Sequence, residues 1–438
     1  MSGSLASSLL RYRALLIGCS LVTLGFFLLF KFSKQWNDAH LYVNMGDSVI
    51  SLNKSSSIEA VNVSDLADGG KVRPQSISRP QYLPGVPKPP GSLYRKTIVA
   101  ARTQGEDASW LELELLGWET AIYVADNTTA PLHTPKNKGH EGMAYLTYII
   151  DHYDNLPDVI AFVHSHQFAW HVDEIFGGDA VVMLQRLNPA RVMRQGYVNL
   201  RCIWAPGCPD WMRPGNVHED EKKQEEKMLA NTFSEVFPNE AVPEILAQPC
   251  CAQFAVSGER VRAVPKSRYI FYRDWLLRTS LSDYIAGRVW EYLWHVVFSG
   301  EYVNCPAEHY CYCDGYGVCF GGSEAYDAFR NLSGQKKELE NNLTDWQSQA
   351  QAVELAYMNN DDLDETTAVK VPEPGKDVQL MHQIAAKENA LQRMIDEAVV
   401  RGDDPKLRAM DLGRTWKEAD GKEWLEGDES LDYKRPRA

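Results

Sequence analysis

The stretch that most restricts the fold is a short apolar run, Val159–Val163, that ends abruptly in titratable residues. Its length and β-branched content predict a buried strand of a parallel sheet. His164, His166, His171 and Asp173 follow it. Ligands of open α/β sheets bind beyond the carboxyl ends of the strands, so this strand end is a candidate site. Packed, hydrogen-bonded histidines without a ligand are the alternative.

The runs on either side of this stretch predict an α/β domain. Strand-like apolar runs alternate with segments that carry helical periodicity. Such alternation folds into a parallel sheet with right-handed crossovers, so a Rossmann-like, mostly parallel sheet with flanking helices is predicted. We expect strands at Thr97–Arg102, Thr120–Ala125, Val159–Val163 and Cys250–Val256, and helices that start at Glu106 or cover Glu141–Tyr153, Glu219–Phe233, Arg268–Leu277 and Ser282–Phe298.

Eight of the nine cysteines lie beyond residue 200, and four of them form a dense group. An even number fits disulfides made in an oxidising compartment. Zinc binding is the alternative, but the group lacks the two-residue spacing that paired zinc ligands usually have. We therefore expect a disulfide-rich segment that closes the domain, containing Cys305, Cys311, Cys313 and Cys319.

An uncharged apolar segment near the N-terminus, Ala14–Phe30, has the length of a short transmembrane helix. A cleaved signal peptide is the alternative, but no small-residue cleavage pattern follows the segment. We expect an uncleaved signal anchor, and the flanking basic residues do not set its orientation. The Ser-, Asn- and Pro-rich residues up to 93 have no persistent period and predict a flexible stem.

Sequons and cysteines together predict the orientation of the chain. Asn-x-Ser/Thr sequons begin at Asn53, Asn62, Asn127, Asn331 and Asn342. With the cysteines they predict a single-pass type II membrane protein whose bulk faces the lumen of the secretory pathway, in the Golgi or the ER. A cytosol-facing domain with unused sequons is the alternative.

The net charge of −14 argues against nucleic acid as a partner, because phosphate binding needs a basic surface. More than half of that charge comes from the last quarter of the chain, where helical periodicity recurs over Lys336–Tyr357 and Asp377–Val400. These helices would either pack on the domain or stand apart, before a mobile tail. The predicted parts are a cytosolic tail (1–13), a transmembrane anchor (14–31), a stem (32–93), an α/β domain (94–322) and an acidic helical extension (323–438).

Four separate blocks carry a resemblance to a known family. They run from Ala100 to Leu111, from Asn155 to Val159, from Cys251 to Ser257 and from Gly287 to His295. As a set they resemble a fungal family that is catalogued only as a domain of unknown function, number thirty-four thirty-one. The resemblance covers residues 96–320, and it implies relatives rather than an activity.

The order of anchor, stem and alternating strands is also distantly similar to nucleotide-sugar glycosyltransferases of the GT-A-like type. That resemblance implies that Arg102, after the first strand, and Asp126, after the second, hold the nucleotide. Such enzymes usually carry an Asp-x-Asp pair that holds a divalent metal on the diphosphate. The matching strand end here is His164-Ser165-His166, so this chain departs from the pattern at its metal site.

Two histidine-containing pairs have the spacing of metal ligands. His164 and His166 lie two residues apart, and His171 and Asp173 repeat that spacing. Side chains two apart on an extended strand share a face, so one ion would contact both histidines. Imidazoles suit Zn²⁺ or Mn²⁺ better than Mg²⁺. We therefore expect these four residues to bind a divalent metal, and the alternative is a hydrogen-bonded set without an ion.

A transferase also needs a carboxylate that takes the proton of the acceptor hydroxyl. Glu291 interrupts an aromatic helix and shares a face with His295, and Asp173 is the other candidate. A salt bridge between Glu291 and Arg288 is the alternative reading of that glutamate. The predicted substrate-binding residues are Arg102, Asp126, Trp170 and His295.

The sequence therefore predicts a membrane-anchored glycosyltransferase that moves a sugar from a nucleotide donor to a hydroxyl of a glycan, glycolipid or protein. A non-catalytic lumenal protein, which binds a partner through the same cleft or through the acidic helices, is the alternative. A metal-dependent hydrolase is disfavoured because the chain has no zinc-peptidase signature.

Overall fold

The computed structural model describes residues 80, 82–218, 220–358 and 370–415. The predicted cytosolic tail, the predicted anchor and most of the predicted stem lie outside these ranges. Within them, no helix combines the length and the apolar character that a membrane span requires.

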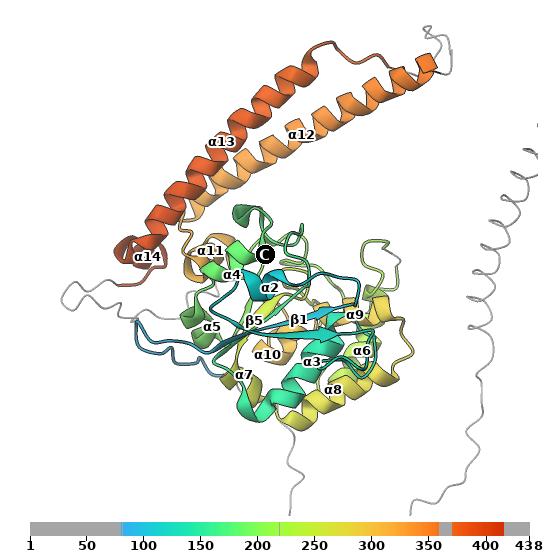
Figure 1. Ribbon diagram of the computed structural model, residues 1–438, viewed down its shortest axis with the longest axis vertical. Helices are drawn as coiled ribbons and strands as arrows, with labels where there is room; N and C mark the ends of the chain where they lie inside the picture. Colours follow the sequence, from blue (N-terminus) through green and yellow to red (C-terminus); the bar gives the residue numbers. More distant parts are fainter. Residues whose placement is uncertain (1–79, 81, 219, 359–369, 416–438) are drawn as a thin grey trace, which may run out of the picture. The chain divides into compact units, whose positions relative to one another are not determined.

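The described residues fold around one mixed sheet (Figure 1). The strands lie in the order β2-β1-β3-β5-β4, and β1 pairs in parallel with both β2 and β3. The fifth strand, β5, runs antiparallel to both of its neighbours. The predicted mostly parallel α/β sheet is therefore confirmed, with β5 as the reversed strand. The bounds are β1 Lys96–Arg102, β2 Glu119–Val124, β3 Val159–Val163, β4 Tyr197–Asn199 and β5 Phe254–Ser257.

Helices cover both faces of the sheet (Figure 1). Those between β1 and β5 are α2 Trp110–Leu113, α3 Glu141–His152, η2 Tyr153–Asn155, η3 Glu174–Phe176, α4 Ala180–Arg186, α5 Pro189–Gln195 and α6 Glu226–Val236. Those after β5 are α7 Gly258–Ala263, α8 Lys266–Arg278, α9 Asp283–Glu291, α10 Trp294–Ser299, α11 Glu308–Tyr316, α12 Ser323–Met358, α13 Lys376–Asp403 and α14 Pro405–Asp411.

Alternating side chains of the strands divide the interior into two cores. In β1, Val99 belongs to the core that contains α3, α8 and α10, whereas Ile98 and Ala100 belong to the core that contains α4, α5 and α11. In β3, Phe162 faces the first core and Ala161 the second. This alternation follows from the two-residue period of a strand. Because both faces are covered, these strands are apolar without interruption.

The predicted helix over Ser282–Phe298 is in fact two helices. α9 ends at Glu291 and α10 begins at Trp294. The side-chain amide of Gln248 donates a hydrogen bond to the main-chain oxygen of Glu291, so this carbonyl is bound from outside the helix. Such an insertion into the hydrogen-bond ladder is a usual cause of a helix break. The break places the Glu291 side chain at a helix end.

Disulfides rather than zinc take up the eight cysteines beyond residue 200, as predicted. Two of them, Cys202–Cys311 and Cys208–Cys305, join segments far apart in the sequence. The other two are local: Cys313–Cys319 and the bond between the neighbours Cys250 and Cys251. The long-range bonds constrain the unfolded chain most, because they close the longest loops.

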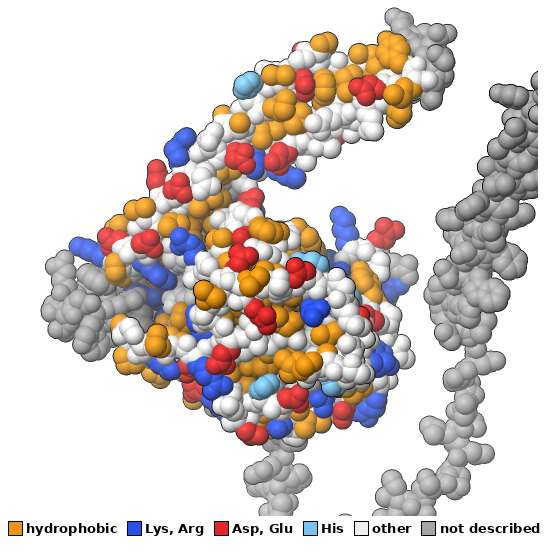
Figure 2. Space-filling model, viewed as in Figure 1, with side chains coloured by type: hydrophobic (Ala, Val, Ile, Leu, Met, Phe, Trp, Pro, Cys, Tyr) orange, Lys and Arg blue, Asp and Glu red, His pale blue; other side chains and the backbone are white. Residues whose placement is uncertain are grey.

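The acidic extension forms a helical hairpin, in which α12 and α13 lie side by side (Figure 1). Near its base, Tyr326 and Phe329 of α12 and Leu391 and Ala398 of α13 are buried in the second core. The rest of the hairpin carries exposed hydrophobic side chains, visible in Figure 2, that include Leu355, Tyr357, Met358, Val378 and Met381.

A fully buried carboxylate fixes α14 to the domain. Asp314 in α11 accepts two hydrogen bonds from Arg194, at 2.7 and 2.8 Å, and lies 3.1 Å from a nitrogen of Arg414. Arg408 of α14 donates to the main-chain oxygen of Asp314 at 2.9 Å. Burial raises the pKa of Asp314, but Arg194, Arg414 and Arg191 outweigh it and hold this pKa at about 2. The aspartate is therefore ionised at every physiological pH.

Asp314→Asn is expected to destabilise the protein by about 3–5 kcal/mol, because it leaves buried arginines without their counter-ion. The native pKa lies below that of an unfolded aspartate, so the contribution is complete above about pH 4 and is lost as the pH falls towards 2. Urea titrations at pH 7 and pH 3 measure both effects. Asp345→Asn, in the exposed part of α12, is the matched control. Equal stability of the two variants at pH 7 would contradict the assignment.

Candidate functional site

Several titratable side chains from distant parts of the sequence meet at the end of β3. Glu141 is the first residue of α3, His164 directly follows β3, and Glu291 is the last residue of α9. Cys250 and Cys251 precede β5, which runs antiparallel to β3 and therefore starts where β3 ends. We call Glu141, His164, His171, Glu291 and the Cys250–Cys251 disulfide the His164 cluster.

Both ring nitrogens of His164 face polar partners. Nε2 lies 2.7 Å from the main-chain oxygen of Cys251, and Nδ1 lies 3.6 Å from a carboxylate oxygen of Glu141. A carbonyl oxygen only accepts, so the Nε2 atom carries the hydrogen. In the neutral ring the lone pair on Nδ1 therefore points at Glu141, and a proton taken by this carboxyl group would be shared with the imidazole.

Glu291 is an acid that stays protonated at neutral pH. Burial raises the pKa of its carboxyl group to about 8, the charge of Glu141 adds to this rise, and Arg288 partly opposes it. The Cys251 N–H donates to the Glu291 carboxyl group. Arg288 does not form the alternative salt bridge with Glu291, since its guanidinium binds Glu225 at 2.7 and 2.9 Å. A buried carboxyl group with a strongly raised pKa is a usual feature of catalytic acids and bases.

The backbone around the cluster is strained. Among the described non-glycine residues, those with positive φ are His140 (48°), Cys251 (87°) and Ala252 (52°). All three adjoin the cluster, because His140 precedes Glu141. Such conformations cost about 1–3 kcal/mol each and gather at functional sites. Gly287 makes room for His140, since a β-carbon there would lie 2.2 Å from the imidazole.

His171 and Trp170 extend the cluster towards the surface. The rings of His171 and His164 are 4.5 Å apart between centroids. Burial first, and then the neighbouring His164, Arg201 and His166, lower the pKa of His171 to about 3, so its imidazole is neutral. Its Nε2 is buried without a hydrogen-bond partner among the described residues. Trp170 is 71% exposed, with the Arg201 guanidinium 5.4 Å from its ring, and offers a flat apolar surface beside the histidines.

The tips of β1, β2 and β3 are joined by direct contacts. The Gln104 N–H, in the loop after β1, donates to Asp126 after β2 at 2.9 Å. Glu106, in the same loop, lies 3.8 Å from Nε2 of His166 after β3. Arg102 donates to the main-chain oxygen of Glu106 at 3.2 Å. The structure therefore brings the predicted residues Arg102, Asp126 and His166 to one edge of the sheet.

The four predicted metal ligands do not all come together: the rings of His164 and His171 are neighbours, but His166 lies beside Glu106 and Asp173 is buried elsewhere. Among the described residues, the one group of three ligand atoms within 4.8 Å of one another contains none of His164, His166, His171 and Asp173. His164 donates to the Cys251 oxygen, and Asp173 belongs to a different network. The arrangement of these four side chains does not fit a shared divalent ion.

Asp173 and His295 lie inside the protein. Asp173 is 1% exposed and accepts from the Cys202 N–H and the Tyr312 hydroxyl, both at 2.8 Å. Burial outweighs the nearby Arg201 and raises the pKa of Asp173. His295 has no exposed surface, and its Nε2 lies 3.0 Å from the Tyr302 oxygen. Neither side chain is open to a ligand, so both serve the packing around the candidate site.

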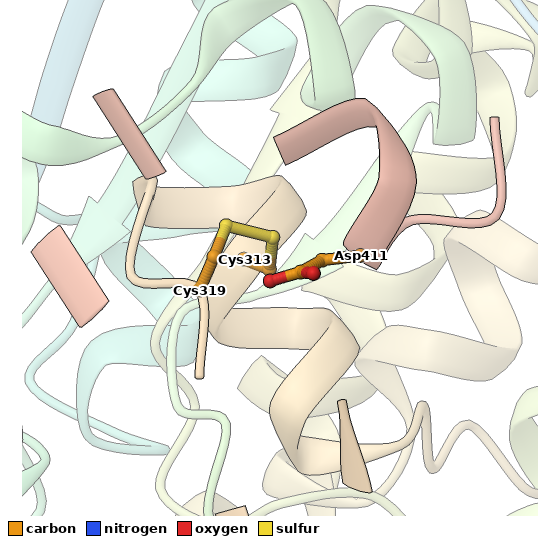
Figure 3. A group of neighbouring side chains, drawn as sticks. All are labelled: Cys313, Cys319 and Asp411. Carbon is orange, nitrogen blue, oxygen red and sulfur yellow. A yellow bond between two sulfur atoms is a disulfide. The ribbon is translucent and has the colours of Figure 1, made fainter. Parts of the chain in front are cut away.

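The group of three potential ligands among the described residues is the Cys313–Cys319 disulfide beside the carboxylate of Asp411 (Figure 3). Cys313 and Cys319 are bonded to each other, so neither sulfur is a thiolate. Asp411 binds Arg401 at 2.6 and 2.7 Å and accepts the Gly321 N–H at 3.0 Å. Because a cysteine binds a metal as its thiolate, which a disulfide sulfur is not, this arrangement does not fit a metal centre.

Two members of the His164 cluster were missed by sequence reasoning. Glu141 was expected only as the start of a helix, although Gly139 and His140 before it signal an unusual turn. The pairing of Cys250 with Cys251 was signalled only by their adjacency in the sequence. The hydrogen bond between His164 and the main-chain oxygen of Cys251 could not be predicted from the periodicity of the sequence.

Comparison with known proteins identifies the domain but not its activity. Residues 98–314 match the family model described as a protein of unknown function (DUF3431). This match supports a domain-of-unknown-function family over these residues, which is the part of the family prediction that the comparison bears on. No curated protein and no solved structure matches the chain.

Proposed function

We propose that this DUF3431 domain is a glycosyltransferase that moves a sugar from a nucleotide donor to a hydroxyl acceptor. The observation that carries the proposal is the convergence of three strand tips through the Gln104–Asp126 and Glu106–His166 contacts, at 2.9 and 3.8 Å. The crevice beyond the carboxyl ends of parallel strands is the general ligand position in open α/β sheets.

Asp126 and Arg102 form the nucleotide end of the proposed site. Asp126 is exposed and accepts only the Gln104 N–H among the hydrogen bonds described for its carboxylate, so an oxygen remains for a ribose hydroxyl. An acid that follows a strand of such a sheet is a usual ribose ligand. The Arg102 guanidinium, held near Glu106, supplies positive charge for the diphosphate.

The His164 cluster forms the chemical end of the proposed site. Glu141 takes the proton from the acceptor hydroxyl and shares it with Nδ1 of His164, 3.6 Å away. The acceptor oxygen then bonds to the sugar carbon, and the bond from this carbon to the diphosphate breaks. The nucleoside diphosphate leaves with the electron pair. Glu291, protonated at neutral pH, donates a hydrogen bond to a sugar or acceptor oxygen during the transfer.

The alternative proposal is a non-catalytic binding protein. The exposed hydrophobic side chains of the α12–α13 hairpin, such as Leu355 and Met381, favour a partner-binding role for that part. The raised pKa of Glu291 favours an enzyme, because perturbed carboxyl groups gather at catalytic sites. A lumenal location remains part of the proposal, and the four disulfides support it, since such bonds persist in oxidising compartments.

Nucleotide binding tests the proposal directly. We expect UDP or GDP, or one of their sugar conjugates, to raise the melting temperature of the full chain, since a ligand that binds only the folded state stabilises it. Asp126→Asn is expected to weaken that binding by about tenfold to a hundredfold, because it replaces a charged acceptor with a neutral one. Isothermal titration calorimetry measures the affinity of each variant.

Asp345→Asn is the matched control for this experiment, because it removes the same charge from an exposed position of α12. Absence of stabilisation by every nucleotide would refute the transferase and leave the binding protein. Equal affinities of the Asp126 and Asp345 variants would remove Asp126 from the site.

A further inference from the structure

A cavity of about 290 Å³ lies beside the edge strand β2, and none of its lining residues belongs to the His164 cluster. Tyr123 of β2, the loop at 131–135, Thr147 and Asp151 of α3 and Arg273 of α8 line it. The Leu132 oxygen accepts the Val124 N–H at 3.0 Å, so the loop is fixed to the end of β2. The cavity is therefore built from anchored elements.

The Tyr123 hydroxyl is buried without a partner. Tyr123 is 1% exposed, and its oxygen has no hydrogen bond among the described residues. More than nine in ten buried polar groups are satisfied in proteins, and an unsatisfied one costs stability. Tyr123 lines the cavity, so a ligand bound there would lie beside this unsatisfied hydroxyl. Burial raises the pKa of Tyr123, and the charge of Asp151 adds to the rise, so the hydroxyl keeps its proton and donates.

The other polar groups of the cavity complete a set of donors and acceptors. The Nε atom of Arg273 is also buried without a partner among the described residues. Asp151 is exposed at the cavity and supplies acceptor oxygens. One cation, from α8, and one carboxylate, from α3, line the same cavity and balance each other in charge, which favours a neutral ligand that both donates and accepts. Thr147 contributes no free donor, because its hydroxyl donates to the Met143 oxygen at 2.7 Å.

We propose that this cavity binds a single neutral sugar ring. Neighbouring hydroxyl groups of such a ring donate to a carboxylate and accept from a guanidinium and a phenol, the groups that Asp151, Arg273 and Tyr123 present. Pro131, Leu132 and Pro135 supply apolar contacts for the C–H face of the ring. Pockets for drug-sized ligands span about 300–1,000 Å³, so a cavity of this size suits one ring rather than a nucleotide.

This sugar site does not depend on the proposed transfer reaction. It would hold a glycan unit on the α3–α8 side of the domain whether or not the chain is an enzyme. The test uses the full chain with glucose, galactose, mannose, N-acetylglucosamine and glucuronate, and saturation-transfer NMR reports binding. We expect at least one neutral sugar to bind.

Two variants locate that binding. Tyr123→Phe removes the buried hydroxyl alone and is expected to weaken sugar binding about fivefold, while the melting temperature of the free protein stays the same or rises. Arg273→Gln is expected to weaken binding about tenfold or more. Arg278→Gln is the control on the same helix, because its exposed side chain donates to the Asp274 oxygen within α8. Tyr357→Phe, on the exposed hairpin, is the control for the tyrosine.

The proposal has clear opposing outcomes. Binding of no sugar, or of glucuronate alone, would overturn the assignment of a neutral ring. Binding that survives both Tyr123→Phe and Arg273→Gln would overturn the location. The two proposals are tested separately. Asp126 lies outside this cavity, so Asp126→Asn is expected to weaken nucleotide binding and to leave sugar binding unchanged. Tyr123→Phe and Arg273→Gln are expected to weaken sugar binding and to leave nucleotide binding unchanged.

Discussion

Glu291→Gln is expected to lower the rate of sugar transfer by about tenfold, because the proposed role of the protonated carboxyl group is to donate a hydrogen bond during the transfer. The amide keeps the shape of the side chain and still donates, but its N–H is a weaker donor than the O–H of a carboxylic acid. The carboxyl group has a pKa of about 8, so wild-type activity is expected to fall as the pH rises past 8. The residual activity of the variant should not show that decline. A pH–rate profile of kcat for both proteins measures this difference.

A second readout separates chemistry from folding. The pKa of Glu291 is higher in the folded protein than in the unfolded chain. Between these two pKa values the folded state therefore keeps a proton that the unfolded state has lost. Wild-type stability is therefore expected to fall as the pH rises from about 4.5 to about 8, by about 2–4 kcal/mol, and the glutamine variant should lack this loss. Glu354→Gln, exposed on α12, is the matched control. If the pH–rate profile of kcat is the same in the Glu291 variant as in the wild type, Glu291 has no part in the reaction.

Replacement of both Cys250 and Cys251 by serine is expected to lower transfer by about 100-fold while the protein stays folded. The main chain of Cys251 accepts from His164 through its oxygen at 2.7 Å and donates to Glu291 through its N–H, so it positions both side chains. Its φ of 87° is unfavourable for a non-glycine residue. Without the bond to its neighbour, this peptide is free to relax. A misplacement of about 1 Å is enough for a loss of that size.

The stability of this double variant is part of the prediction. A disulfide between neighbours closes almost no loop, so the free energy of unfolding is expected to change by about 1 kcal/mol or less. Replacement of Cys313 and Cys319, bonded six residues apart, is the control, and it should leave kcat unchanged. Chemical denaturation and steady-state kinetics report the two quantities. Full activity of the Cys250/Cys251 variant would contradict the prediction, because it would mean that other contacts keep the main chain at residue 251 in place.

The strands of the parallel half could be predicted, but the direction of β5 could not. Val159–Val163 is apolar at every position because both of its faces are buried, and this signal is strong. The run that contains β5 is also mostly apolar, but apolar content is the same for either strand direction. The break at Glu291 was also hidden, since it depends on the distant side chain of Gln248.

The candidate site was predicted where sequence order determines geometry. Arg102, Asp126 and His166 follow parallel strands, and such strand ends meet at one edge of a sheet. Asp173 has the same local appearance as those residues, yet Cys202 and Tyr312 surround it. Its burial depends on contacts with residues 29 and 139 positions away, which no local pattern encodes.

The contacts that hold α14 on the domain limit where the protein can be truncated for expression. The recognised family region stops at residue 314, yet Arg408 and Arg414, beyond that boundary, bind Asp314 itself. A fragment cut at the boundary would lose these guanidinium groups and uncover the apolar surface that Phe329 and Leu391 occupy. The segment to express is therefore set by these tertiary contacts rather than by the limits of the family match, and it has to include Arg408 and Arg414.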